Sequence, residues 1–223
     1  MNTNSILLED LNLPQTKNAV VIVGRFQPPT IGHYKVIDKA KKYIRENKHL
    51  NLFTKPILVI VNGKESSKDK KLNPLSVEDR AYYLEHSGRA NGVVILSAHN
   101  AFAAFNEVRK EGYEPIVVAA GSDRVDDYIR LLDEKFLDLN GKRQKHYKIG
   151  ELARHELPSS ETSLKKIKDE SSIDAGEVSG SLARRAAELE YFEEFVKIVG
   201  LEKNIPAAKK MFKQIKAHLG EQA

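Results

Sequence analysis

The chain has 223 residues, 41% of them hydrophobic, which suits one α/β domain with a core of its own. It contains no cysteine, so disulfides and thiolate metal ligands are excluded, and the expected compartment is the reducing cytoplasm. Its 36 basic and 31 acidic residues are interspersed and leave a formal charge of +5, and no apolar run approaches the roughly 18 residues of a membrane span. We therefore expect no nucleic-acid partner and no membrane segment.

The N-terminal 1–18 segment has two acids and no basic residue before Lys17, which is unlike a secretory signal and predicts a loose arm. A β-branched run at 19–23 predicts a strand that stops at Gly24. The Pro-Pro pair at 28–29 permits neither a continued strand nor a helix interior, so a turn follows. From Gly32 onward a helix is predicted, with an apolar face formed by Val36, Ile37, Ala40, Tyr43 and Ile44.

Strand-like and helix-like segments alternate through the middle of the chain. Strands are predicted at 56–62, 93–97 and 115–120, with helices from Ser76 to about Gly88 and at 101–110. A basic loop at 63–73 follows the second strand. With right-handed crossovers, this order predicts a doubly wound parallel sheet of Rossmann-like type, in which ligands bind beyond the carboxyl ends of the strands.

The 139–180 segment is polar and has strand-like runs only at 147–149 and 155–157, a pattern compatible with a lid. Helices are predicted at 181–190, 191–199 and 205–219, the last with an apolar face that would pack on the core or on a second subunit. We divide the chain into an arm at 1–18, an α/β domain at 19–190 and a C-terminal helical extension at 191–223.

The connection between the first strand and the first helix, GRFQPPTIGH at 24–33, has the features of an anion site. Gly32 would let a phosphate approach the N–H groups at the helix start, where the dipole is positive, and His33 adds a donor. The first turn carries His33 and Lys35 but no acid, opposite to what helix stability favours. A tight connection with a surface histidine is the alternative, and it leaves the Pro-Pro turn and the cationic start unexplained.

A second helix start, VSGSLARR at 178–185, has two hydroxyls, a glycine and two arginines where acids would ordinarily stand. Ser179 and Ser181 can donate to phosphate oxygens, and Arg184 offers a planar fork for two of them. Taken alone, a serine-capped surface helix with solvated arginines explains the segment equally well. The pairing with the first motif favours a phosphate site.

The segment GRFQPPTIGH resembles the H/T-x-G-H signature of the nucleotidyltransferase superfamily of adenylyl- and cytidylyltransferases, and VSGSLAR resembles its second signature, I-S-x-T-x-x-R. The GRFQP opening is similar to archaeal-type nicotinamide-nucleotide adenylyltransferases, and the RFxPPTxGH form resembles small nucleotidyltransferases of large tailed phages. Thr30 takes the place of the first histidine, while Val178 and Ser181 stand where the second signature often has Ile and Thr.

The resemblance implies that an acceptor phosphate attacks the α-phosphorus of a nucleoside triphosphate and that pyrophosphate leaves, without a covalent enzyme intermediate. It gives catalytic contacts with the phosphates to His33 and Arg184. We expect Lys64, the lysine of the basic loop nearest the strand end, to reach a phosphate as well. The resemblance assigns nucleotide or acceptor binding to Gly24, Arg25, Phe26, Gln27, Thr30, Gly32, Gly121, Asp123, Ser179 and Ser181. Mg²⁺ would be held mainly through the substrate phosphates, without protein metal ligands.

Several candidate positions have ordinary structural alternatives. An aspartate after a strand, such as Asp123, is also a common turn or helix cap. A run of charged residues in a loop is usually exposed to solvent without a binding role, which is the alternative for Lys64, Lys68, Lys70 and Lys71. Arg80 matches an arginine often found on the corresponding helix of the family, and a surface salt bridge explains it equally well.

The leading hypothesis is adenylyl transfer from ATP to nicotinamide mononucleotide, as in NAD biosynthesis. Cytidylyl transfer from CTP to a phosphorylated alcohol or sugar is the close alternative, because the phosphate chemistry is the same. A non-catalytic nucleotide-binding or virion-associated protein is the alternative from another class. The expected location is the cytoplasm, that of the host if a phage encodes the protein, and a homo-oligomer is compatible with the last helix.

Overall fold

A computed structural model describes residues 17–63, 69–121, 124–137, 142–149, 160–169 and 178–219. Lys64 and Asp123, which the sequence assigns to the site, lie outside these ranges, as does the strand expected at 155–157. None of the described helices has the length and apolar character needed to cross a membrane.

The described strands form one parallel sheet in the order β3-β2-β1-β4-β5. Their bounds are Lys17–Gly24 (β1), Ile57–Val61 (β2), Val94–Ala98 (β3), Tyr113–Ala119 (β4) and Tyr147–Lys148 (β5). The central strands β1, β2 and β4 are almost entirely buried, which explains why their sequences are apolar without alternation. The predicted doubly wound α/β fold is confirmed.

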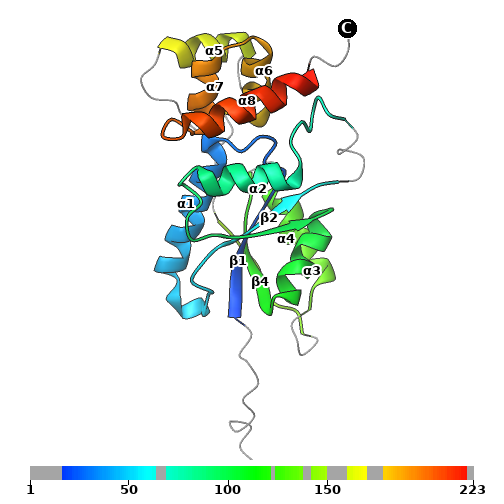
Figure 1. The fold of residues 1–223 in the computed structure, drawn as a ribbon. Helices are drawn as coiled ribbons and strands as arrows, with labels where there is room; N and C mark the ends of the chain where they lie inside the picture. Colours follow the sequence, from blue (N-terminus) through cyan, green and yellow to red (C-terminus); the bar gives the residue numbers. More distant parts are fainter. Residues whose placement is uncertain are drawn as a thin grey trace, which may run out of the picture.

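Helices cover both faces of this sheet (Figure 1). Helices α1 (Ile31–Glu46) and α2 (Val77–His86) share one core cluster with the strands, and α3 (Ala101–Lys110) and α4 (Val125–Lys135) share the other. A 3₁₀ turn, η2 (Lys48–Leu50), follows α1. The change of face between α2 and α3 accompanies the change of direction in strand order, because β4 pairs with β1 on the side away from β2.

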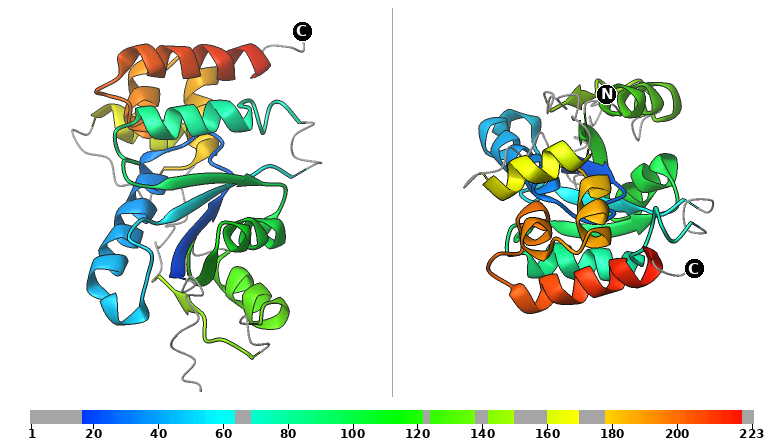
Figure 2. Two further views of the ribbon diagram at one scale, coloured as in Figure 1. Left: turned by 60° about the horizontal axis from the view of Figure 1, so that its bottom comes forward. Right: turned by 90° about the horizontal axis from the view of Figure 1, so that it is seen from above.

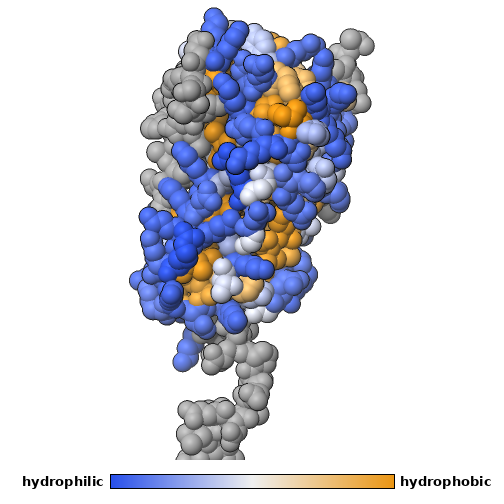
Figure 3. All heavy atoms as spheres, turned by 60° about the vertical axis from the view of Figure 1, so that its left-hand side comes forward, coloured by the Kyte–Doolittle hydropathy of each residue, from blue (hydrophilic) through white to orange (hydrophobic). Residues whose placement is uncertain are grey.

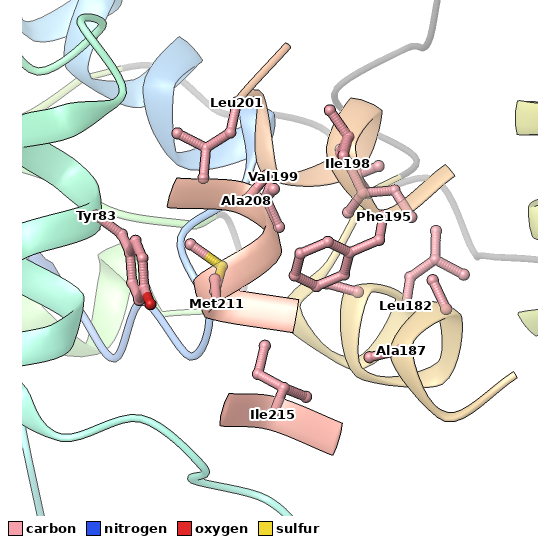
Figure 4. Close-up of a cluster of buried hydrophobic side chains, with 14 of the residues drawn as sticks. Tyr83, Leu182, Ala187, Phe195, Ile198, Val199, Leu201, Ala208, Met211 and Ile215 are labelled. Carbon is pink, nitrogen blue, oxygen red and sulfur yellow. The ribbon is translucent and has the colours of Figure 1, made fainter. Parts of the chain in front are cut away.

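Four helices form a further layer over the carboxyl end of the sheet (Figures 1 and 2). They are α5 (Ser160–Asp169), α6 (Gly180–Glu188), α7 (Phe192–Val199) and α8 (Ile205–Leu219). Their apolar side chains make one cluster, in which Phe195, Met211 and Ile215 pack with Tyr83 of α2 (Figure 4). The cluster contains residues of α5 and α6, which precede residue 190, and of α7 and α8, which follow it. Residue 190 is the predicted end of the α/β domain.

Two helices, α4 and α5, are absent from the elements predicted above. The α4 sequence has two acids in its first turn, Asp126 and Asp127, and buries Val125 and Leu132 against the sheet. In α5, Leu164 and Ile167 are buried in the cluster with α6 and α7. A short polar helix with so narrow an apolar stripe gains its stability from tertiary packing, which a local pattern does not reveal.

Helix α1 and the molecular surface follow the expected amphipathic pattern, with apolar side chains inside and polar ones outside. Helix α1 buries Tyr34, Val36, Ile37, Ala40 and Ile44, four of which belong to the predicted stripe. On the face seen in Figure 3, hydrophilic residues predominate and hydrophobic residues form smaller patches between them.

Gly200, which ends α7, joins the helical layer to α1. Its φ is +67°, and a Cβ at this position would lie 2.9 Å from Ile31 Cγ2 and 3.2 Å from the Tyr34 ring. Gly112 provides a matched position, because its φ is +81° but a Cβ would meet nothing within 4 Å.

We expect Gly112→Ala to cost about 1 to 2 kcal/mol, from left-handed backbone strain alone. Gly200→Ala should cost at least about 1 kcal/mol more, because overpacking adds to the same strain. Urea unfolding followed by circular dichroism measures both variants. Equal losses would contradict the packing of α7 on α1 described above.

Candidate functional site

The carboxyl ends of β1 and β4 form the topological switch point of the sheet, and we refer to the space beyond them as the crevice. These adjacent strands lead to helices on opposite faces, α1 after Gly24 and α4 after Gly121. The Gly121 carbonyl accepts the N–H groups of Arg124 at 2.9 Å and Val125 at 3.1 Å, and thereby begins α4. Ligands of open α/β sheets bind at such a crevice.

Helix α1 begins at this crevice with an unusual capping box. Thr30 is the N-cap residue and is 1% exposed, and its backbone N–H donates to His33 Nδ1 at 3.0 Å. The Thr30 hydroxyl oxygen also lies 3.0 Å from Nδ1. Because a backbone N–H can only donate, Nδ1 must accept, and the proton of the neutral imidazole is on Nε2. Glu or Gln usually fills the place of His33 in a capping box. His33 keeps the acceptor that the capping box needs, at Nδ1, and adds a donor at Nε2.

Gly24 and Phe26 support the imidazole. The Phe26 side chain is buried, its ring centroid lies 4.8 Å from that of His33, and its φ is +51°. A Cβ on Gly24 would approach the Phe26 ring to 3.0 Å. The small residue therefore leaves room for the ring that packs against His33, while Gly32 lies within the first turn of α1.

Helix α6 brings the second motif to the same crevice. Ser179 is its N-cap, with the side chain accepting the Leu182 N–H at 3.1 Å, and the first turn has no acid. Arg184 Nη2 donates to Ser181 Oγ at 3.1 Å, and its Nη1 donates to the backbone carbonyl of Gln27. The two motifs, 157 residues apart at that hydrogen bond, are thus in direct contact.

The charges at this contact are arranged to favour an anion. Burial lowers the pKa of the Arg184 guanidinium, and the nearby positive charge of Arg25 lowers it further, while Asp69 opposes both effects. The first turns of α1 and α6 contain no acid that would neutralise their helix dipoles. Two like charges beside two positive helix ends are stabilised by a bound anion.

Arg80 neither forms the surface salt bridge considered above nor lies on the surface. It is 1% exposed, and among the described residues no acid forms an ion pair with it. Its guanidinium donates to the carbonyls of Arg25 at 2.6 Å, Val61 at 3.2 Å and Ser76 at 3.0 Å, and to Asn62 Oδ1 at 3.0 Å. Burial lowers the pKa of Arg80 to about 10, so the group stays cationic at neutral pH.

Arg80 therefore holds the loop after β1, the end of β2 and the start of α2 together, with a positive charge behind the crevice. Sequence reasoning missed this role and that of Asn62. The available signal was Asn62 itself, a polar side chain that directly follows an apolar strand and hence lies at the ligand-binding edge.

The remaining predicted residues divide into two groups. Arg25 is exposed at the end of β1, and Lys70 and Lys71 are exposed before α2, whereas Lys64, Lys68 and Asp123 lie outside the described residues. Within the described ranges, no group of three or more His, Cys, Asp or Glu side chains could hold a metal ion.

The chain is similar to the crystal structure of a bifunctional NMN adenylyltransferase/ADP ribose pyrophosphatase from Francisella tularensis, complexed with AMP and a Mn ion. The two share 18% sequence identity with a TM-score of 0.47, and the match covers 90% of this chain. It covers 52% of that protein, so this chain spans about half of its length. No curated protein matches the sequence significantly.

The sequence profile of the cytidylyltransferase-like family matches residues 21–173. This region runs from Val21 in β1 through α5. It therefore contains the sheet except for the first residues of β1, and it includes the capping box of α1. Since the match extends over more than half of the chain, the protein belongs to the cytidylyltransferase-like family.

Proposed function

We propose that the protein is an enzyme that transfers a nucleoside monophosphate from a magnesium-bound nucleoside triphosphate to a phosphorylated small molecule. The observation that carries this proposal is the meeting of two acid-free helix starts at the crevice, one with His33 and the other with Arg184. Membership in the cytidylyltransferase-like family supports the same reaction class.

In the proposed reaction an acceptor phosphate oxygen attacks the α-phosphorus, and a new P–O bond forms. The bond from the α-phosphorus to the bridging oxygen breaks, and the electron pair leaves with pyrophosphate. His33 Nε2–H donates to the triphosphate, and Ser181 with Arg184 binds the β and γ phosphates. Such donors accelerate the reaction because negative charge grows on the leaving group in the transition state.

For the nucleotide and acceptor, we propose ATP and nicotinamide mononucleotide, on the basis of the GRFQP resemblance. Arg25 and Gly121, at the ends of β1 and β4, stay proposed nucleotide or acceptor contacts, and so does Asp123 on the basis of the family resemblance. Lys64 stays a proposed catalytic contact with the phosphates, because it is the basic-loop lysine nearest the predicted end of the second strand. CTP with a phosphorylated alcohol or sugar is the second candidate, favoured by the family to which the chain belongs.

Pyrophosphate release decides between these substrates. We expect release with ATP plus nicotinamide mononucleotide, and none with CTP plus phosphorylated alcohols or sugars. Each nucleotide is incubated with each acceptor, and product is identified by mass spectrometry. Release only with CTP would assign the second candidate, and no release with any pair would leave a nucleotide-binding protein without turnover.

His33→Glu separates the structural role of His33 from the catalytic one. Glutamate preserves the capping box and adds a favourable charge at the helix start, so the free energy of unfolding should rise by roughly 0.5 kcal/mol. Its carboxylate repels the triphosphate, and kcat/KM should fall at least about a hundredfold.

Thermal unfolding and steady-state kinetics test the two effects on the same sample. Arg184→Ala should show a similar kinetic loss without added stability. A His33→Glu enzyme with unchanged kcat/KM would remove His33 from the proposed site.

Metal removal provides a separate test. We propose that the cation binds with the nucleotide, because Mg²⁺ keeps several waters and usually binds through substrate phosphates with few protein ligands. EDTA should abolish pyrophosphate release, Mg²⁺ should restore it, and the apparent metal affinity should follow nucleotide concentration. Full activity in EDTA would contradict a magnesium-bound substrate.

A further inference from the structure

The Gln27 side chain is used inside the protein. It is 6% exposed, and its carboxamide pairs with both hydrogen-bonding groups of the Leu75 backbone. Gln27 Nε2 donates to the Leu75 carbonyl at 2.7 Å, and Oε1 accepts the Leu75 N–H at 3.1 Å. The family resemblance assigned this residue to nucleotide or acceptor binding, whereas the structure gives its amide a partner 48 residues away.

Leu75 connects this pair to the helical layer. Its side chain is buried in the cluster that α5, α6, α7 and α8 form, so its backbone position depends on how that layer packs. The next residue, Ser76, caps α2 and accepts a hydrogen bond from Arg80. The Gln27 carboxamide therefore ties the loop after β1 to the start of α2 and, through Leu75, to the layer that contains α6.

The Gln27 backbone makes the second connection. Its carbonyl accepts from Arg184 Nη1, and a Cβ placed on Gly180 would lie only 2.5 Å from the same oxygen. Glycine at the first position of α6 thus allows the helix start to touch this peptide. Side chain and backbone of one residue together set the separation of the α1 and α6 starts.

We propose that Gln27 is a positioning residue for triphosphate binding, and that it acts through Arg184. This inference rests on the proposed function, because the two helix starts matter together only if one ligand contacts both. When the carboxamide is removed, the Gln27 peptide loses its anchor on Leu75 and the Arg184 guanidinium shifts relative to His33. A misplacement of about 1 Å in a catalytic site can cost about a hundredfold in rate.

A purely structural amide would behave differently. It would lower the amount or stability of folded protein and leave the affinity of the folded fraction for phosphate unchanged. Gln214 supplies the matched control, because its Nε2 donates to Asp79 Oδ1 at 3.0 Å and its Oε1 accepts from the Tyr83 hydroxyl. That amide joins α8 to α2 in the same layer without touching the residues assigned to the phosphates.

The test uses the full chain as wild type, Gln27→Met, Arg184→Ala, the double variant and Gln214→Met. Inorganic tripolyphosphate affinity is measured by calorimetry, and kcat and KM by pyrophosphate release. We expect Gln27→Met to weaken tripolyphosphate binding and raise the nucleotide KM at least about tenfold, without changing the acceptor KM. In the Arg184→Ala background the same change should add less than about twofold, since residues that act through one another are non-additive.

Gln27→Glu gives a second variant in case Gln27→Met does not fold. A protonated glutamate can donate to the Leu75 carbonyl as the amide does, whereas the carboxylate would repel that oxygen. Tripolyphosphate affinity of Gln27→Glu should therefore approach the wild-type value as pH falls and decline as pH rises, relative to wild type at each pH.

Full additivity with Arg184→Ala, or a Gln27→Met enzyme that loses only stability as Gln214→Met does, would overturn the inference. If wild type binds tripolyphosphate but releases pyrophosphate from no nucleotide, the proposed function fails while the binding cycle still tests Gln27. A wild type that binds no tripolyphosphate would overturn both.

Discussion

The contact between Gly180 and the Gln27 peptide is the constraint on which the rest of the site depends. A Cβ at Gly180 would stand 2.5 Å from the Gln27 oxygen. Any residue larger than glycine at the start of α6 would therefore force the helix away from the loop. The same oxygen accepts from Arg184, and the Gln27 side chain holds Leu75. One short loop after β1 thereby sets the position of a helix more than 150 residues later, through contacts of the Gln27 side chain and the Gln27 carbonyl group.

Around this contact the protein gathers positive charge that stability alone would not favour. Among the described residues, Arg80 is buried behind the loop with neutral hydrogen-bond acceptors. Burial and the charge of Arg25 lower the pKa of Arg184, and two helix starts lack acids. Burying cations costs solvation free energy, and like charges repel. In the proposed function, a polyanion bound at the crevice would offset both costs, because it attracts the positive charges that surround it. The proposed catalysis is therefore mostly positioning and charge stabilisation.

Much of the fold could be predicted from local patterns. The apolar strands and the helices α1, α2, α3, α6, α7 and α8 follow periodicity and capping signals, and their order implies the doubly wound sheet. Helix α4 carries similar signals, with two acids in its first turn, but was not predicted. Helix α5 has only two buried apolar residues, Leu164 and Ile167, and depends on packing against its neighbours. In the candidate site, the acid-free helix starts at His33 and Ser181 were visible, because capping chemistry is local.

The sequence by itself determined which polar groups stand at each helix start, since the relevant residues lie within one turn of each other. Only the tertiary structure decided that Gln27 serves Leu75 and Arg184, and that Arg80 is buried beneath the loop it supports. These contacts join residues 48, 157 and 55 positions apart. No local period encodes such separations, because they arise when the helical layer closes over the sheet and brings both motifs to one crevice.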